Sequence, residues 1–219
     1  VQEWVAHALG IGNHAVTVQC RRMGGGFGGK ETQAGHLAVW SALAARKFGC
    51  PIKLRLDRDD DFMITGKRHP FAYNWDVGFD DTGLITGLKL QMAANCGFSA
   101  DLSGPVADRA IFHADNAYFL PAIEILSHRY RTHTVSNTAF RGFGGPQGMI
   151  AIERVMDAVA AATGLDVDGF WELVLEATAR LQVRGGALPE AQRRIPEMVE
   201  TSDDGTQDTD DSHQPGAAR

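Results

Sequence analysis

Cysteine is scarce in this sequence of 219 residues, and the few cysteines present do not form pairs. Cys20, Cys50 and Cys96 are far apart along the chain, and none belongs to a C-x-x-C motif. Zinc sites and iron–sulfur clusters need several cysteines or histidines at short spacing. We therefore expect no disulfide framework, zinc site or iron–sulfur cluster built by this chain alone, and a reducing, cytoplasmic setting fits best.

Long apolar runs and an excess of positive charge are also missing. No stretch of about 18 consecutive apolar residues occurs, so no membrane-spanning helix is expected. The net charge of −6 argues against binding to nucleic acid or to an anionic membrane surface. A hydrophobic content of 44% is enough for a buried core. The first residue is not Met and the opening stretch does not resemble a signal peptide, so we expect the chain to begin inside a longer natural sequence.

Residue periodicity predicts a mixture of strands and helices. Strands are expected at residues 14–23, 51–56, 71–79, 84–95 and 122–134. Helices are expected at residues 1–9, 32–48 and 147–164, with a short helix beginning at Ser103 and a charged turn or short helix at 57–66. A mixed order that includes a hairpin predicts an α+β fold with two layers, a mixed sheet and helices, rather than a regular doubly wound sheet.

The chain changes character toward its C-terminus. Residues 180–200 have weak periodicity with scattered Gly and Pro, and residues 197–211 hold seven acidic residues and no Lys or Arg. Such a composition is typical of disorder. We therefore expect a disordered acidic tail over residues 197–219.

The most informative stretch is RRMGGGFGGKET, residues 21–32, in which five of the six central residues are glycine. It nearly matches the phosphate-binding loop G-x-x-x-x-G-K-[ST], but Glu31 replaces the hydroxyl residue that binds Mg²⁺ and would repel phosphate oxygens. Gly24, Gly26 and Gly29 also satisfy the dinucleotide-binding pattern G-x-G-x-x-G, which is a weak signal alone. Neither nucleotide interpretation fits well.

A third interpretation is a loop that brings main-chain N–H groups against another anionic or oxo ligand. Glycine permits positive φ and close approach of the backbone, Phe27 would offer its amide, and Glu31 would aim a carboxylate into the same cavity. A tight turn without a ligand is the alternative, although five glycines cost more entropy than a turn requires. A second FGG copy at residues 143–145 also follows an arginine and precedes a helix, so two loops can converge on one ligand.

Three long motifs carry a family resemblance: RRMGGGFGGKET, GFSADLSGPVADRAIFHADNAYFLP and THTVSNTAFRGFGGPQGM. Together they resemble the molybdenum-binding subunit of bacterial xanthine dehydrogenases, in the molybdenum hydroxylase family. The resemblance covers about residues 1–165 and implies that this range is part of a molybdopterin-binding domain. It fades beyond residue 165, so residues 166–196 are expected to form a helical or irregular segment that matches the family poorly. It also implies hydroxylation of an electron-poor carbon at a molybdenum–molybdopterin cofactor, with iron–sulfur clusters and FAD on a partner chain.

The resemblance assigns residues to a cofactor site and to a substrate site. The cofactor would be held by Gly26, Phe27, Gly28, Arg141 and Gly142, with the backbone of Phe27 and Arg141 against the molybdenum centre. The substrate would contact Glu31, Arg109 and Phe143, which match the family's substrate residues.

These three side chains suit a purine such as hypoxanthine or xanthine. By resemblance, Glu31 would hydrogen-bond the ring, Arg109 would stabilise negative charge developing on it, and Phe143 would stack on its face. An aldehyde or another heterocycle remains an alternative substrate, and a non-catalytic remnant or a module that binds a ligand or partner remains an alternative function. The family's general base is a glutamate far beyond this sequence, so we expect the isolated chain to be inactive.

Overall fold

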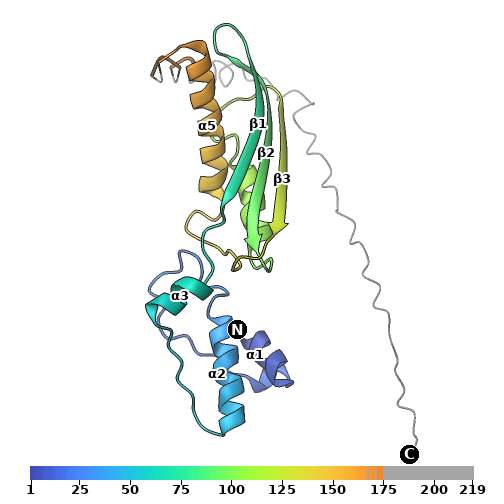
Figure 1. Ribbon diagram of the computed structural model, residues 1–219, viewed down its shortest axis with the longest axis vertical. Coiled ribbons are helices and arrows are strands. Elements are labelled where there is room, and N and C mark those ends of the chain that lie inside the picture. Colours follow the sequence, from blue (N-terminus) through green and yellow to red (C-terminus); the bar gives the residue numbers. More distant parts are fainter. Residues whose placement is uncertain (167, 171, 175–219) are drawn as a thin grey trace, which may run out of the picture. The chain divides into compact units, whose positions relative to one another are not determined.

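The chain is built around a mixed three-stranded sheet, seen in a computed structural model that describes residues 1–166, 168–170 and 172–174. The strands β1 (Phe71–Phe79), β2 (Ile85–Gly97) and β3 (Ile123–Arg131) lie in the order β1-β2-β3 (Figure 1). β1 pairs antiparallel with β2, and β2 pairs parallel with β3. The parallel pair is joined by the crossover helix α4 (Ser103–Phe112). The predicted α+β fold with a mixed sheet is confirmed.

The predicted hairpin forms at the expected place. Tyr73 lies opposite Met92 in the antiparallel register. In the turn, the Asp80 carboxylate accepts hydrogen bonds from the backbone N–H groups of Thr82 and Leu84, at 2.9 and 3.0 Å. Gly83 adopts a φ of +90°, which a residue with a side chain rarely adopts. The DDTG sequence therefore supplies both the local acceptor and the left-handed residue that the turn needs.

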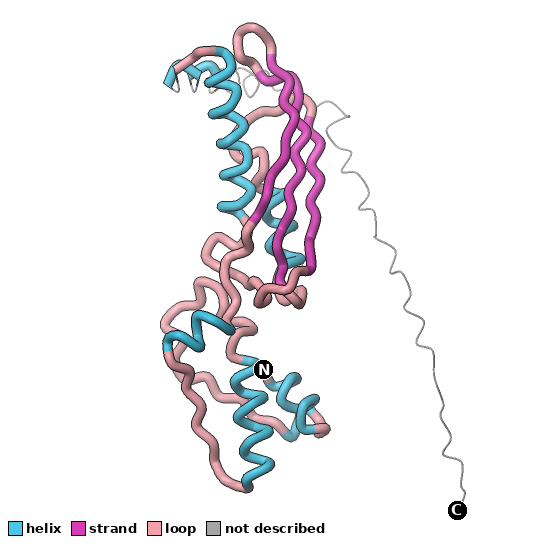
Figure 2. Tube along the Cα trace, in the orientation of Figure 1, coloured by secondary structure: helices cyan, strands magenta, loops and turns pink. Residues whose placement is uncertain are grey.

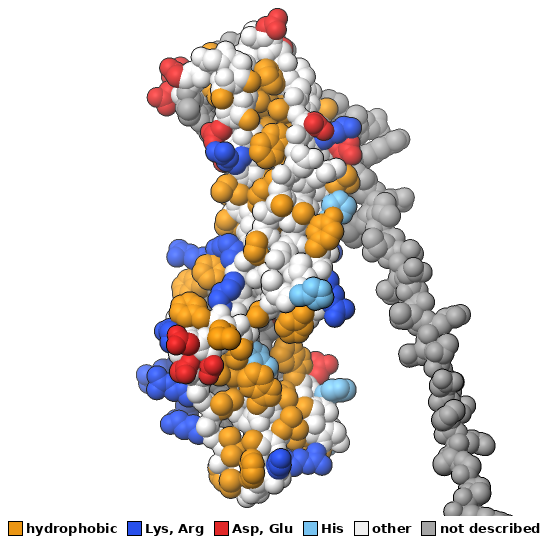
Figure 3. Space-filling view, in the orientation of Figure 1, with side chains coloured by type: hydrophobic (Ala, Val, Ile, Leu, Met, Phe, Trp, Pro, Cys, Tyr) orange, Lys and Arg blue, Asp and Glu red, His pale blue; other side chains and the backbone are white. Residues whose placement is uncertain are grey.

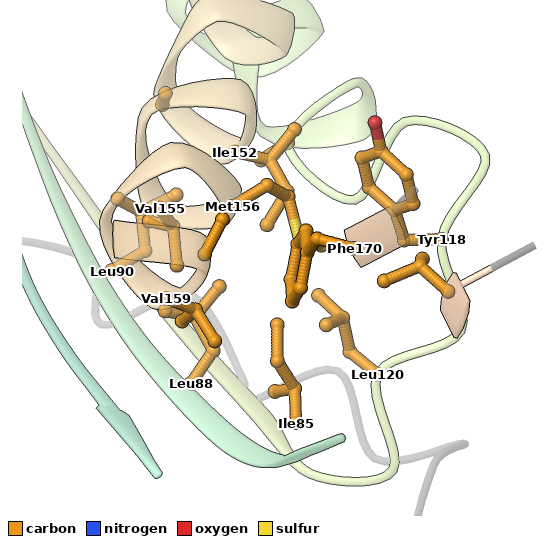
Figure 4. Packing of buried hydrophobic residues seen from close by; sticks show 14 of the residues in the cluster. Ile85, Leu88, Leu90, Tyr118, Leu120, Ile152, Val155, Met156, Val159 and Phe170 are labelled. Carbon is orange, nitrogen blue, oxygen red and sulfur yellow. The ribbon is translucent and has the colours of Figure 1, made fainter. Parts of the chain in front are cut away.

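The helices α4 and α5 (Gly145–Thr163) lie on one face of the sheet (Figure 2). The hydrophobic core lies between these helices and that face. Alternate residues of β2, Leu88, Leu90 and Met92, are buried on that face. α5 contributes residues at helical spacing, among them Ile152, Val155, Met156 and Val159 (Figure 4). Burying each such side chain contributes roughly 1.5–3 kcal/mol, so this layer holds the helices on the sheet.

Residues 1–64 form three α-helices and no strand. These are α1 (Gln2–Leu9), α2 (Gly35–Phe48) and α3 (Arg58–Ile64), with a 3-10 turn at Asn13–Ala15. α1 packs so closely on α2 that a Cβ at Gly35 would lie 2.1 Å from the Trp4 ring. The N-cap of α3 is Asp57, whose carboxylate accepts from the Asp60 N–H at 2.8 Å. Large apolar side chains remain exposed over this region (Figure 3). Trp40, Phe48 and Met63 are examples.

Two strand predictions are wrong. Residues 16–23 and 51–56 have no regular secondary structure, and nearly all of them are exposed. A strand is stable only when a neighbour binds its N–H and C=O groups. Within the residues that the structure describes, neither segment has such a neighbour, so alternation of apolar side chains does not by itself produce a strand there.

Other predictions concern the ends of elements and the C-terminus. α5 ends at Gly164 as expected, with a left-handed C-cap. No helix in the described ranges is both long and apolar enough to cross a membrane. Most of the predicted irregular segment 166–196 and all of the predicted acidic tail 197–219 lie outside the described residues.

Candidate functional site

The two FGG copies share a backbone conformation as well as a sequence. Phe27 has a φ of 55° and is followed by Gly28 at 97°. Phe143 has a φ of 49° and is followed by Gly144 at 94°. A phenylalanine in the left-handed region is strained, and strain of this kind clusters at functional sites. The repeated conformation therefore marks both loops as candidates for one site.

The two glycine loops contact each other. A Cβ at Gly28 would lie 2.3 Å from the Ala139 carbonyl oxygen and 2.6 Å from the Phe140 Cα. The Arg141 guanidinium lies over the Phe27 ring, 5.7 Å from its centroid. The first loop can approach the second this closely only because residue 28 has no side chain.

Main-chain N–H groups in both loops are free of protein acceptors. Among the described residues, the N–H groups of residues 24–32 and 139–142 donate to no backbone or side-chain oxygen. Consecutive free N–H groups on glycine-rich backbone form a concave donor surface for an anion or an oxo group. The geometry thus supports the third sequence interpretation over a tight turn without a ligand.

The structure also argues against a phosphate-binding loop. In such a loop the lysine reaches the phosphates. Here the Lys30 ammonium folds back and donates to the carbonyl oxygens of Met23 and Gly25, the latter at 2.6 Å. The lysine therefore binds the loop itself.

The second loop and the start of α5 pack closely on α4, the helix that carries Arg109, through Gly144 and Gly148. A Cβ at Gly144 would lie 2.0 Å from the Val106 carbonyl oxygen, and one at Gly148 would lie 2.1 Å from that of Ala110. Arg109 is exposed on α4, and its Nε donates to His113 Nε2 at 3.3 Å. The position of Arg109 is thus tied to the loop that contains Phe143.

Glu31 lies apart from these contacts. It is exposed in a turn after the first loop, and α2 begins only at Gly35, three residues later than the predicted start at residue 32. Four turn residues at 31–34 separate the loop from the helix. No hydrogen bond or ion pair joins Glu31 to Arg109 in the part of the chain that the structure describes. Their predicted shared role in substrate binding remains a prediction.

Sequence reasoning assigned no role to Arg68 and His69, yet both lie beside the second loop. Arg68 donates to the Arg141 carbonyl at 2.6 Å and lies 4.5 Å from the Phe140 ring centroid. His69 is buried, and its Nε2 is 2.8 Å from the Ser103 hydroxyl at the start of α4. The signal available in the sequence was the run of Lys67, Arg68 and His69 within the stretch MITGKRHPF, residues 63–71.

Burial also sets the charge state of His69. Desolvation lowers its pKa below the ordinary value of 6.5, while the Asp101 carboxylate and a backbone hydrogen bond at Thr138 act in the opposite direction. The Gln147 side-chain amide on α5 donates to the His69 carbonyl at 3.3 Å. His69 therefore links the segment before β1 to both helices of the site.

Comparison with known proteins identifies the family of this chain. The model of the molybdopterin cofactor-binding domain matches residues 1–173. Xanthine dehydrogenase/oxidase of Mus musculus is 47% identical over 167 residues, and that of Gallus gallus is 48% identical over 164 residues. These alignments cover 76% and 75% of this chain, and the chain spans 12% of the length of each relative.

Solved structures of similar fold include two oxidoreductases and a carbon monoxide dehydrogenase. The aldehyde oxidoreductase of Desulfovibrio gigas has a TM-score of 0.65 at 28% identity, covering 75% of this chain and 18% of that one. Quinoline 2-oxidoreductase of Pseudomonas putida has a TM-score of 0.61 at 25% identity, covering 76% and 21%. The carbon monoxide dehydrogenase of Oligotropha carboxidovorans, at 21% identity and a TM-score of 0.63, shares the fold.

Proposed function

This chain belongs to the family of molybdopterin cofactor-binding domains, and we propose that it forms part of the cofactor site of a xanthine dehydrogenase-type molybdenum hydroxylase. The observation that carries the proposal is the pair of left-handed FGG loops that touch at Gly28 and Ala139. Their free N–H groups fit an oxo-metal centre, because such a ligand offers acceptors but no protons.

The loops would hold the cofactor mainly through backbone atoms. The N–H groups of Phe27 and Arg141 would face the molybdenum centre, and Gly26, Gly28 and Gly142 would allow the approach. When bound, the cofactor supplies oxygen transfer from water to an electron-poor carbon and accepts the electrons released. The part of this chain in that chemistry is to bind and orient the cofactor with uncharged donors.

The substrate in this proposal is a purine such as hypoxanthine or xanthine. The Arg109 guanidinium would stabilise negative charge on the ring, the Glu31 carboxylate would accept a ring N–H, and Phe143 would stack on the ring. Support comes from the contact that fixes α4 against the second loop. The curated relatives named above are xanthine dehydrogenases, which favours this substrate over an aldehyde.

The proposal includes more protein than this chain. The chain spans 12% of the relatives' length, so we assign the remaining cavity, the general base, the iron–sulfur clusters and FAD to other parts of the enzyme. The exposed apolar side chains over residues 1–64 support a surface that packs on further protein. We place the assembly in the cytoplasm, where the exposed thiols of Cys20 and Cys50 stay reduced.

The decisive experiment is a substrate comparison in a complete protein that carries this segment. Glu31→Ala and Arg109→Ala are each expected to lower kcat/KM for xanthine roughly 100-fold or more, because each removes a charged group at the ring. Turnover of an aldehyde should fall much less. Arg154→Ala, which removes an exposed ion pair on α5, is the control and should leave both unchanged.

Two results would contradict the proposal. Equal loss of aldehyde and xanthine turnover would favour a molybdenum hydroxylase for another substrate. Absence of molybdenum from the purified complete protein would favour a non-catalytic binding module. We also expect no xanthine hydroxylation by the 219-residue chain alone, and molybdenum-dependent turnover by it would overturn that expectation.

A further inference from the structure

A basic side chain binds the equivalent carbonyl in each glycine loop. Lys30 Nζ donates to the Gly25 carbonyl at 2.6 Å, and Arg68 Nη2 donates to the Arg141 carbonyl at 2.6 Å. Gly25 and Arg141 each lie two residues before the phenylalanine of an FGG copy. The Lys30 contact and the Arg68 contact are therefore matched in sequence position. The backbone at the two positions differs, because φ is positive at Gly25 and Gly142 but not at Gly26 or Arg141. The two basic residues come from unrelated places in the sequence.

This contact fixes the direction of the next N–H group. In a trans peptide the C=O of one residue and the N–H of the following residue point in opposite directions. The described backbone contains no cis peptide bond. When Lys30 holds the Gly25 carbonyl, the Gly26 N–H points away from the ammonium group. When Arg68 holds the Arg141 carbonyl, the Gly142 N–H points away from the guanidinium group.

The surroundings of Arg68 indicate a fixed contact rather than a chance one. Arg68 is half-buried and lies 4.5 Å from the Phe140 ring centroid. Hydrogen bonds from a charged donor are about twice as strong as neutral ones. Glycine backbone is otherwise free to rotate, and Gly142 has a φ of +93°. A charged partner is a direct way to hold one peptide orientation in such a loop.

We propose that Lys30 and Arg68 are matched positioning residues that turn the N–H groups of Gly26 and Gly142 toward the cofactor. The proposal rests on the proposed function of the same site. Neither residue touches the cofactor in this scheme, because each acts through a carbonyl of its own loop. The same side chains also place their positive charges on the carbonyl side of the loops, away from the donor surface.

The test measures loop structure directly by NMR on the full chain, without cofactor. Loop amides that donate within the protein report opening: Phe143 to Phe140 and Gly145 to Gly142 in the second loop, and Gln33 to Gly29 after the first. The Leu88 amide, which donates to Ala122, reports the core. Amide chemical shifts of Gly26 and Gly142 report the orientation of the two peptides.

Arg68→Met is expected to raise hydrogen exchange of the Phe143 and Gly145 amides roughly 10-fold or more and to shift the Gly142 amide. Exchange at Gln33 and Leu88 should stay within a factor of about two. Lys30→Met should show the reverse selectivity, with faster exchange at Gln33 and a shifted Gly26 amide.

Matched variants separate positioning from general destabilisation. Arg68→Lys and Lys30→Arg keep a cationic donor and should restore most of the protection. Lys89→Met and Arg154→Met remove basic residues from exposed ion pairs elsewhere and should change no loop amide. Unchanged loop amides in Arg68→Met and Lys30→Met would overturn the proposal, as would an equal rise at Leu88.

A second measurement links the loops to the cofactor. In a complete protein that carries this segment, Arg68→Met and Lys30→Met should each lower the molybdenum content per chain several-fold, and the conservative variants should retain it. Wild-type molybdenum content in both methionine variants would overturn the role toward the cofactor. A wild-type protein without molybdenum would instead contradict the proposed function, while the NMR result would still decide whether the two side chains orient the loops.

Discussion

Phe27 and Phe143 occupy the same left-handed backbone conformation, with φ values of 55° and 49°, in two loops that are more than a hundred residues apart in sequence. Each is followed by a glycine at nearly the same angle, 97° and 94°. The two FGG copies thus share a backbone conformation as well as a sequence. Because the first loop also touches the second at Gly28, we assign the free N–H groups of both to one proposed site.

Gly28→Ala is expected to break the contact between the loops. A Cβ there would lie 2.3 Å from the Ala139 carbonyl oxygen, and the φ of +97° adds strain. We expect the free energy of unfolding to fall by about 2–3 kcal/mol, measured by urea denaturation. Gly24→Ala is the control, since its φ is +66° but nothing lies within 4 Å, and it should cost about 1 kcal/mol. Equal costs would show that the loops do not press on each other.

Gly148→Ala tests the packing that positions Arg109. Alanine normally stabilises a helix interior by roughly 0.5–1 kcal/mol relative to glycine. At residue 148 the added Cβ would lie 2.1 Å from the Ala110 carbonyl oxygen, so we expect a net loss of about 1–3 kcal/mol in thermal denaturation. Gly104→Ala in α4, where nothing lies within 4 Å, should be neutral or stabilising. A stabilising Gly148→Ala would contradict the close contact of α4 and α5.

His69 is expected to make the fold sensitive to acid. Burial lowers its pKa below 6.5, so the unfolded chain binds a proton at a higher pH than the folded chain does. Its contribution to stability is therefore fully present above pH 6.5 and decreases as the pH falls below that value. Urea denaturation from neutral pH down to about pH 5 should show a shallower decrease for His69→Gln than for the wild type. His133→Gln, in an exposed loop, should keep the wild-type slope, and an unchanged slope in His69→Gln would refute the assignment.

Phe170→Ala tests whether residues beyond α5 belong to the core. The side chain is 1% exposed and lies among Met156, Ile85 and Leu120 (Figure 4). Its truncation should cost about 3–5 kcal/mol in the free energy of unfolding. Phe48→Ala, at a side chain that is 67% exposed, should cost less than about 1 kcal/mol. Similar small effects of both substitutions would place Phe170 outside the core.

Local sequence was enough to predict an element where the short segment itself contains the groups that determine its structure. The DDTG turn after β1 carries its own acceptor, Asp80, and its own left-handed residue, Gly83. The helix α5 carries an apolar stripe and the terminating Gly164. The same was not true of residues 16–23, whose alternation resembles a strand, because a strand depends on a neighbour that local sequence does not contain.

The sequence by itself determined the family, the two glycine loops and the mixed α+β character, since these follow from long motifs and from residue periodicity. Only the tertiary structure decided that Gly28 lies against Ala139, that α4 meets the second loop through Gly144, and that Arg68 holds the Arg141 carbonyl. Each of these contacts joins residues that are distant in the chain. Local sequence does not contain the contact partner of such a glycine or arginine, because the partner is brought near only by the fold.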